Sequence, residues 1–301
     1  MKKILVVGAT GLVGSRFVSL AKDKVGIIPV DENTLDITSA EAVDNYFSEN
    51  EFDSVLNFAA ITNVDAAEKE KGDENGITWR LNVVGVENLT KACIKYNKFI
   101  VQISTDFIFK GDQNNPGPYS EDAEIPDSMD GIGWYGWTKN RAENLLRNSE
   151  CRNVIVRIAY PFYSAEFTPK LDYAKNYLKL HDDGKLFPIF TDQTLSVINV
   201  DELVEPLLKI LTEELIGTFH IVSSNTTTPF DFVEYLLRKA RNVEGVVQKG
   251  LMEEFLKAEG RTPRPRLGGF KTKFTEKNLN MKFKTWQEMV DEFVIRLQNK
   301  K

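Results

Sequence analysis

Tyr135 and Lys139 stand four residues apart in the segment Tyr135-Gly136-Trp137-Thr138-Lys139. On a helix, side chains with this spacing share one face, so the lysine ammonium would lie beside the tyrosine phenol. A neighbouring positive charge favours the phenolate and lowers the pKa of the phenol. The same ammonium can also bind the hydroxyl groups of a ribose. The pair therefore predicts an acid–base catalyst that works beside a nucleotide.

Three glycines near the amino terminus predict where that nucleotide binds. Gly8, Gly11 and Gly14 follow the apolar run at residues 4–7. Where a strand turns into a helix, missing side chains let the backbone approach a pyrophosphate at the positive end of the helix. A tight turn without a ligand is the alternative, but the position directly after the first apolar run favours a dinucleotide. The residues of this turn that we expect at the cofactor are Gly8, Thr10, Gly11, Leu12, Val13 and Gly14.

Charged residues after the glycines bear on the choice between NADH and NADPH. Asp31 follows the second apolar run, where a carboxylate accepts hydrogen bonds from the adenosine ribose and repels a 2′-phosphate, which favours NAD. Arg16 argues for NADP, because a guanidinium just after the glycines can bind that phosphate. Asp36 and Ile37 are candidate neighbours of the adenine, although a helix cap explains Asp36 about as well. We expect NADH or NADPH, with NAD slightly favoured.

Small and polar residues follow the third and fourth apolar runs. Ala59 and Ala60 would let a dinucleotide pass close above them, although a plain turn at the edge of a sheet would look the same. In Ser104-Thr105-Asp106, the Thr105 hydroxyl could donate to a substrate oxygen that Tyr135 also contacts. An isolated Ser-Thr-Asp is usually a loop cap. Its spacing ahead of the tyrosine and lysine predicts a catalytic role instead.

The composition is that of a globular enzyme. The chain has 301 residues, 42% of them hydrophobic and 27% charged, and its net charge of −6 argues against nucleic-acid binding. Cys93 and Cys151 are too few for a disulfide framework, and with His181 and His220 they show no spacing typical of a metal site. No segment approaches the roughly 20 apolar residues of a membrane span, and no signal peptide is recognisable. We expect a cytoplasmic protein with two buried thiols and no membrane partner.

Apolar runs alternate with helical patterns up to about residue 160, which predicts an α/β fold with a doubly wound parallel sheet of the Rossmann type. The expected strands are residues 4–7, 25–30, 54–58, 99–103 and 154–158. Because these runs are continuously apolar, helices should cover both faces of the sheet, and the ligand should lie at the carboxyl ends of the strands. Residues 111–130, rich in proline, glycine and acidic residues, predict a loop that could cover a substrate.

Beyond residue 160, prolines punctuate aromatic segments, which predicts a smaller, interleaved second lobe. Its helices are expected at residues 171–181, 201–211, 230–239 and 286–297. Because no flexible linker separates the two parts, the chain should cross between them more than once. We predict a dinucleotide-binding domain of residues 1–160 with about 191–217, and a substrate-binding lobe of residues 161–190 and 218–301.

These motifs resemble those of the extended short-chain dehydrogenase/reductases, and within that group the dTDP-4-dehydrorhamnose reductases. The resemblance covers nearly the whole chain. Besides the glycine turn and the Tyr135/Lys139 pair, it rests on residues 57–68, Leu81-Asn82, residues 104–109, Asp192-Gln193, Thr226-Thr227-Thr228 and Arg264-Pro265.

The resemblance implies a catalytic trio of Thr105, Tyr135 and Lys139. Tyr135 would protonate the C4 carbonyl oxygen of a nucleotide-linked 4-keto-6-deoxysugar, Thr105 would share that bond, and Lys139 would lower the tyrosine pKa and hold the ribose. The hydride would come from the nicotinamide. Related dehydratases follow the threonine with an Asp-Glu pair for elimination, whereas this chain has Asp106-Phe107.

The resemblance also implies substrate contacts from Thr105, Asp106, Tyr160 and Arg264. The Arg264 guanidinium would suit the phosphate oxygens of a nucleotide diphosphate, although short Arg/Pro runs are also common in solvated loops. Tyr160 stands where better-known members have a tryptophan, so the identity of the sugar is open.

Arg16 is a further departure, because it stands where some members have a glutamate at a magnesium-linked dimer interface. A guanidinium cannot bind a metal ion, so we expect no metal, and a homodimer is only a candidate assembly. Two other functions share this fold. A sugar-nucleotide epimerase would keep Tyr135 and Lys139 and retain its cofactor through turnover. A binding module resembling the regulatory subunit of methionine adenosyltransferase would not need the intact trio.

Overall fold

Six parallel strands form the central sheet of the computed structural model, which describes residues 1–167 and 169–299. Their order is β2-β1-β3-β4-β5-β9, with β1 (Lys3–Val7), β2 (Gly26–Val30), β3 (Ser54–Asn57), β4 (Phe99–Thr105), β5 (Asn153–Ile158) and β9 (Gly217–His220). Every residue of β3 and β4 is buried, as expected for strands that helices cover on both faces. The predicted doubly wound parallel sheet is confirmed, and the ends of the five predicted strands differ by at most two residues.

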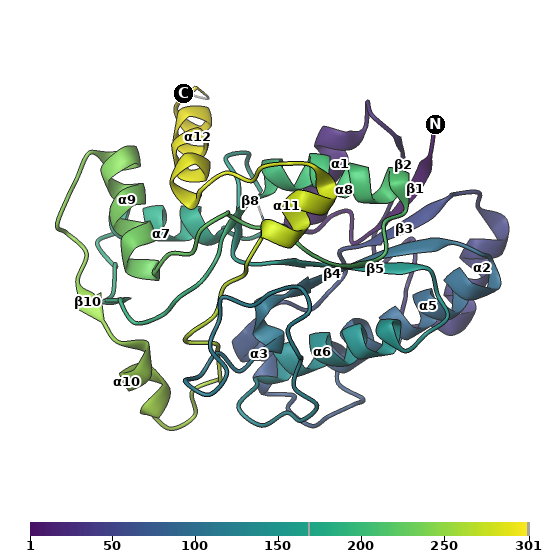
Figure 1. Ribbon diagram of the computed structural model, residues 1–301, viewed down its shortest axis with the longest axis horizontal. Helices are drawn as coiled ribbons and strands as arrows, with labels where there is room; N and C mark the ends of the chain where they lie inside the picture. The colour runs from purple at the N-terminus through teal and green to yellow at the C-terminus, as the bar shows by residue number, and fades with distance from the viewer. Residues whose placement is uncertain (168, 300–301) are drawn as a thin grey trace.

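Helices lie on both faces of this sheet (Figure 1). One layer contains α2 (Ala40–Glu49), α5 (Gly85–Lys95) and α6 (Trp134–Arg147), and the other contains α1 (Leu12–Ala21), α8 (Val200–Glu213) and α11 (Lys273–Leu279). Short helices α3 (Val64–Glu68) and α4 (Ile77–Trp79), a π-helical turn at Arg80–Val84 and a 3₁₀ turn at Asp106–Ile108 complete this part of the chain.

The register of the strands brings their carboxyl ends to one edge of the sheet. Val7 of β1 is paired with Val30 of β2 and with Asn57 of β3, while Thr105 of β4 is paired with Ile158 of β5. The turns that follow β1, β3 and β4 therefore lie at the same edge. This is the edge at which doubly wound folds bind their ligands.

The sixth strand, β9, was not predicted. It pairs with β5 through Val154–Gly217 and the three following residue pairs, so the central sheet continues past residue 217, where we had expected the second lobe to begin. Thr218 and His220 interrupt its apolar pattern, and its four residues are too short for a clear period. β9 is a strand because it pairs with β5, which is about 60 residues away in the sequence.

Most of the remaining elements lie beyond residue 160. They are β6 (Pro161–Phe162) paired with β8 (Ile198–Asn199), β7 (Ile189–Phe190) paired with β10 (Lys249–Gly250), and the helices α7 (Tyr173–Asp182), α9 (Pro229–Arg241), α10 (Met252–Lys257) and α12 (Trp286–Gln298). The four helices predicted beyond residue 160 are found within two residues of their expected ends. The Thr285 side chain begins α12 in a capping box with Glu288.

One apolar core joins the sheet and the lobe. Val101 of β4 and Val156 of β5 belong to the same buried cluster as Phe162, Phe232 of α9 and Phe293 of α12. Such a shared core holds the two parts in a fixed arrangement. A site between them can therefore be built with defined geometry.

Residues 111–130 form no named helix or strand, as predicted, but they pack closely. The Gly117 amide donates to the Leu267 carbonyl at 2.6 Å, the Tyr119 amide donates to the Gly269 carbonyl at 2.9 Å, and the Tyr119 ring stacks on Phe109 at 3.8 Å. This loop therefore holds the carboxyl-terminal segment in place. In the described part of the chain, no helix has the length and the apolar character needed to cross a membrane.

Candidate active site

A cavity of about 380 Å³ lies where the carboxyl ends of β1, β3, β4 and β5 meet the second lobe. The sequence-predicted residues that line it are Gly11, Leu12, Val13, Gly14, Ala60, Thr105, Tyr135, Lys139 and Tyr160. Gly8, Thr10, Asp31, Asp36, Ile37, Ala59, Asp106 and Arg264 are not among its lining residues. The cavity thus unites the candidate catalytic residues with part of the glycine turn, which are far apart in the sequence.

The glycine turn packs so tightly that side chains are excluded from it. Gly8 has a φ of +74°, and a Cβ there would lie 2.6 Å from the Ala59 amide nitrogen. A Cβ at Gly14 would lie 2.2 Å from the Gly8 carbonyl oxygen. Gly11 is the N-cap of α1 and provides no side-chain cap, and the first turn of α1 contains no acidic residue. The amides at this helix end are therefore suited to an anionic group.

Asp31 lies at the carboxyl end of β2 with its carboxylate exposed. Its Oδ1 accepts hydrogen bonds from the Thr34 hydroxyl at 2.8 Å and the Thr34 amide at 2.9 Å, and these bonds lower the pKa of the carboxyl. Asp36 is not the cap of α2, because Ser39 fills that position and Asp36 accepts from the Thr38 amide and hydroxyl. Ile37 is buried.

The Arg16 guanidinium is paired with Asp201 of α8, a partner that we had not expected. Its Nε and Nη2 donate to the two carboxylate oxygens of Asp201 at 2.6 and 2.9 Å, and the guanidinium also lies 5.8 Å from the centre of the Tyr163 ring. Arg296 pairs with the same carboxylate. The contact between α1 and α8, which the sequence did not reveal, brings Arg16 to Asp201. Among the described residues, no group of three or more His, Cys, Asp or Glu side chains is placed to hold a metal ion.

The predicted pair of Tyr135 and Lys139 lies near the start of α6, and both residues are buried. The Lys139 ammonium donates to the Ile103 carbonyl at 2.7 Å, so it is anchored on β4. Gly136 brings this part of α6 against the chain after β4, because a Cβ there would lie 2.0 Å from the Phe107 carbonyl oxygen. The helix thus presents both side chains to the cavity from a position set by backbone contact.

The expected lowering of the Tyr135 pKa by Lys139 is not found. Burial raises the pKa of Tyr135 above its ordinary value, a hydrogen bond with Thr105 opposes this, and the negative charge of Asp106 adds to it. Burial also lowers the pKa of Lys139 to about 8, partly opposed by Glu143. The phenol is therefore protonated at neutral pH, as a proton donor must be.

Thr105 and Asp106 lie beside the tyrosine. The Thr105 hydroxyl donates to Asp106 Oδ1 at 3.3 Å and accepts from the Phe107 amide at 3.4 Å. Asp106 is 1% exposed, and burial raises the pKa of its carboxyl to about 7. A threonine hydroxyl thus lies between a buried carboxyl and the candidate proton donor.

Asn82 is a site residue that the spacing of the sequence did not single out, although Leu81-Asn82 belongs to the resemblance. The π-helical turn holds it so that its amide donates to the Ile61 carbonyl at 3.1 Å and to the Thr138 hydroxyl at 3.0 Å, while its oxygen accepts from the Ile61 amide at 2.8 Å. The Thr138 hydroxyl in turn donates to the Tyr135 carbonyl at 2.8 Å. Asn82 therefore ties the loop after β3 to the helix that carries Tyr135.

Aromatic rings form the lobe side of the cavity. Tyr160 has a φ of +42°, its ring lies 6.1 Å from that of Phe107 and 4.9 Å from that of Tyr173, and its hydroxyl accepts from Gln193 at 3.2 Å. A left-handed conformation is uncommon and strained for a bulky residue, and such residues cluster at functional sites. The Tyr160 ring thus lines the cavity, and its role as a platform for a sugar stays a prediction.

Two cations lie near this side of the cavity. Lys170, which we had not predicted, lines the cavity and donates to the Thr62 hydroxyl at 3.2 Å, and burial lowers its pKa. Arg264 is paired with Asp65, which it contacts through Nη2 at 2.5 Å, and its charge lowers the pKa of Tyr160 against the larger effect of burial. The predicted arginine is therefore close to the cavity without lining it.

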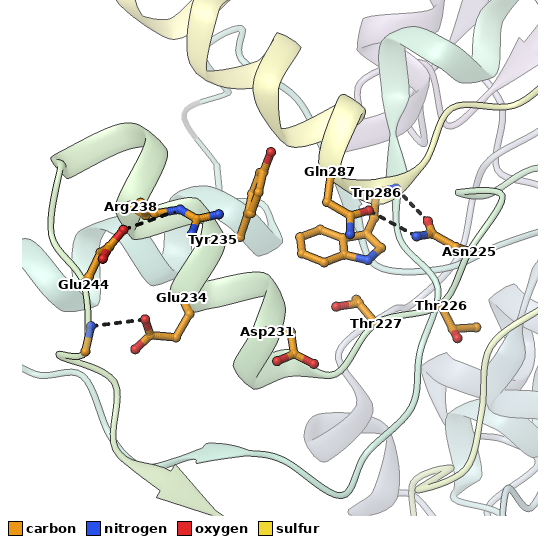
Figure 2. Close-up of a pocket in the computed structure, with 11 residues that line it drawn as sticks. Asn225, Thr226, Thr227, Asp231, Glu234, Tyr235, Arg238, Glu244, Trp286 and Gln287 are labelled. Carbon is orange, nitrogen blue, oxygen red and sulfur yellow. Dashed lines mark hydrogen bonds and ion pairs between the residues drawn. The ribbon is translucent and has the colours of Figure 1, made fainter.

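A second hollow, of about 650 Å³, lies in the lobe between α9 and the start of α12 (Figure 2). Polar side chains in this hollow form hydrogen bonds with one another and with the backbone. The Asn225 amide donates to Gln287, and Glu234 accepts from the Gly245 amide. Thr228 caps α9, so the Thr226-Thr227-Thr228 motif begins a helix here. None of the predicted catalytic residues Thr105, Tyr135 and Lys139 lines this hollow.

Comparison with known proteins agrees with this arrangement. Residues 1–299 match the family described as RmlD substrate binding domain. The chain belongs to this family. The resemblance that we drew from the motifs is thereby confirmed at the level of the family.

Individual relatives are similar over most of their length. A dTDP-4-dehydrorhamnose reductase from Aggregatibacter actinomycetemcomitans is 28% identical over 242 residues, which are 77% of this chain and 77% of the relative. The solved structure of dTDP-4-dehydrorhamnose reductase from Bacillus anthracis in complex with NADP has a TM-score of 0.84 and 25% identity and covers 98% of this chain and 99% of that one. The solved structure of a dTDP-4-dehydrorhamnose reductase from Clostridium acetobutylicum has a TM-score of 0.83 and 28% identity. It covers 98% of this chain and 99% of that one.

Proposed function

We propose that this member of the RmlD substrate binding domain family is an NAD(P)H-dependent reductase of the C4 ketone of a nucleotide-linked 4-keto-6-deoxysugar. The observation that carries the proposal is the meeting of Thr105, Tyr135 and Lys139 in one cavity with the amides that begin α1. A proton donor and a site for an anionic cofactor are thus joined. The dTDP-4-dehydrorhamnose reductases among the relatives support the choice of substrate class.

The turn after β1 fits a dinucleotide, because Gly11 leaves the first amides of α1 without a side-chain cap and no acidic residue opposes an anion there. In this proposal Gly11 and its neighbours would hold the pyrophosphate, Asp31 would bind the adenosine ribose, and Lys139 would bind the second ribose. Asp36 and Ile37 border the adenine, and Ala59 and Ala60 leave room beside β3. A reduced nicotinamide bound here supplies the hydride.

Tyr135 transfers its phenolic proton to the substrate oxygen as C4 receives the hydride, so the ketone becomes a secondary alcohol. Thr105 donates a second hydrogen bond to that oxygen and stabilises the negative charge that develops on it. Because burial keeps the pKa of Tyr135 above its ordinary value, the phenol transfers its proton only to a strongly basic oxygen. Such an oxygen forms only as the hydride arrives, which couples the two transfers.

The substrate is held by residues after β4 and β5 together with the predicted substrate-binding lobe, residues 161–190 and 218–301. Tyr160 supports the sugar, and the cations Lys170 and Arg264 suit the diphosphate. Asp106 is buried and would act on the substrate through its hydrogen bond with Thr105. Arg264 already holds Asp65, so it is a preoriented cation rather than a mobile one. A cytoplasmic location and a homodimer remain predictions.

The test is the oxidation of NADH and NADPH by the purified protein with a panel of nucleotide 4-keto-6-deoxysugars, together with the Tyr135→Phe variant. The parent should oxidise one dinucleotide with at least one sugar, and Tyr135→Phe should turn over about two to four orders of magnitude more slowly while binding the dinucleotide as tightly. Turnover of the variant within about threefold of the parent would remove Tyr135 from the mechanism. A dinucleotide that copurifies and is regenerated in each cycle would favour an epimerase. Copurification of a partner enzyme without any oxidation would favour a binding module.

A further inference from the structure

Glu143 is a buried carboxylate behind the candidate active site. It follows Lys139 by four residues on α6, and the exposed fractions are 0% for Glu143 and 3% for Lys139. Residues with this spacing lie on one face of a helix. That face packs against the central sheet, where α6 runs beneath β4 and β5 (Figure 1). An acidic and a basic group are therefore removed from water on the same face.

Arg157 of β5 holds the Glu143 carboxylate in a bidentate pair. Its Nε donates to Oε1 at 3.0 Å and its Nη2 to Oε2 at 2.7 Å, and Arg157 is 0% exposed. The third guanidinium nitrogen lies 3.2 Å from His220 Nε2. His220 Nδ1 lies 3.0 Å from the Lys271 carbonyl, which can only accept, so Nδ1 carries the proton and Nε2 accepts from Arg157. The histidine is neutral, since burial lowers its pKa to about 3.

Arg147 adds a second cation from the solvent side. Its Nη2 lies 3.1 Å from Glu143 Oε2 and donates to the Thr218 hydroxyl at 2.9 Å, and its side chain is 37% exposed. One carboxylate thus meets two guanidinium groups. Unlike Arg157, Arg147 can be replaced without leaving a buried charge unpaired.

The charged and titratable groups around Lys139 and Glu143 come from several elements. They are Tyr135 and Arg147 on α6, Asp106 after β4, Arg157 on β5 and His220 on β9, with the Ser104 hydroxyl of β4 next to the Glu143 carboxylate. Asp106 lies on the tyrosine side and bonds Thr105. Glu143 lies one helical turn from Lys139 on the same buried face of α6, and its charge opposes the effect of burial on the pKa of the ammonium.

A buried ammonium with only a carbonyl partner tends to lose its proton, and Lys139 bonds only the Ile103 carbonyl among the hydrogen bonds of the described residues. We infer that Glu143 is a positioning residue that keeps Lys139 charged at the cofactor ribose, and that Arg157 holds the carboxylate for this purpose, whereas the charge of Arg147 opposes it. The inference rests on the proposed function, in which Lys139 binds the cofactor. A purely structural Glu143 would join α6 to β5 without affecting the lysine.

The test is the pH dependence of dinucleotide binding, measured by equilibrium titration with NADPH and NADH between about pH 6.5 and 9.5. The parent should bind less tightly above about pH 8, where Lys139 loses its proton. In Glu143→Gln this decline should begin about one pH unit lower, because an attracting charge is removed. In Arg147→Gln it should begin at a higher pH, because a repelling charge is removed. Arg141→Gln, an exposed arginine on the same helix, should leave it unchanged.

Opposite shifts in the two variants cannot come from general loosening of the helix, which would weaken binding at every pH. An onset that is the same in Glu143→Gln and the parent, or that moves the same way in both variants, would overturn the inference. If Glu143→Gln does not fold, the inference is tested with Arg147→Gln alone. A decline in dinucleotide binding that begins at the same pH in Arg147→Gln as in the parent would then overturn the inference. In Lys139→Met the decline of dinucleotide binding with rising pH should vanish, and its persistence would also overturn the inference. The proposed reductase activity is tested separately, by Tyr135→Phe.

Discussion

Replacing Gly136 by alanine should move the Tyr135 hydroxyl away from the Thr105 hydroxyl. A Cβ at this position would lie 2.0 Å from the Phe107 carbonyl oxygen and 2.8 Å from its carbon, whereas ordinary contact begins at 3.4 Å. Both close atoms belong to the backbone, so no side chain can rotate away. The start of α6 must therefore move by more than an ångström relative to the turn after β4. Tyr135 moves with the helix, and Thr105 stays with the strand.

The size of the effect follows from this displacement. A misplacement of about 1 Å costs about a hundredfold in turnover, or about 2.7 kcal/mol of transition-state stabilisation. Overpacking should lower the free energy of unfolding by about 1–3 kcal/mol, while the better helix propensity of alanine returns about 1 kcal/mol. Turnover should therefore suffer more than stability.

The assay is steady-state oxidation of NADPH or NADH, with urea unfolding measured on the same preparations. Gly26→Ala is the matched control, because Gly26 begins β2 at the edge of the sheet. A Cβ at Gly26 would lie 3.2 Å from the Cγ of Lys3, a side-chain atom, so the contact is much less severe. The control should keep the turnover of the parent. Turnover of Gly136→Ala within about threefold of the parent would refute the claim that contact with Phe107 sets the position of Tyr135.

Three further predictions concern the cofactor, the substrate and the pH. Asp31→Ala should raise the efficiency with NADPH relative to NADH, because a carboxylate that repels a 2′-phosphate is removed; an unchanged ratio would show that selectivity lies elsewhere. Arg264→Ala should raise the KM for the sugar nucleotide at least about tenfold with an unchanged dinucleotide Kd, because a charged contact with the diphosphate is lost. Arg261→Ala is the control, and equal kinetics of the two variants would exclude the diphosphate contact. Burial raises the pKa of Asp106 to about 7, so the parent should lose stability as the pH rises from about 4 to 7. Asp106→Asn should therefore be more stable than the parent above pH 7, with a gap in thermal stability that closes below about pH 4; a gap independent of pH would contradict the assigned burial.

Local patterns were sufficient for much of the fold and for the identity of the candidate site. Five strands of the sheet and the helices α7, α8, α9 and α12 were predicted because continuous apolar runs and helical periods reflect burial within one segment, whereas the short α10 was not predicted. The glycine turn and the pair of Tyr135 and Lys139 were predicted because their geometry depends on neighbours in the sequence. Gly8, with its positive φ, is such a case.

Contacts between distant segments decided the rest. Arg16 meets Asp201 because α1 packs on α8, and β9 is a strand because it pairs with β5. The pKa of Tyr135 rises because several elements bury it, which the spacing to Lys139 cannot reveal. Electrostatic effects depend on distance and burial in space, and both are properties of the packed chain.

By itself, the sequence determined that a dinucleotide turn, a parallel sheet and a Tyr-Lys pair on one helix face are present, since each depends on residues at most a few positions apart. Only the tertiary structure decided what surrounds that pair. Glu143, Arg157 and His220 come from α6, β5 and β9 and meet without exposure to solvent. A buried charge needs partners within a few ångströms, and only folding selects which residues those are.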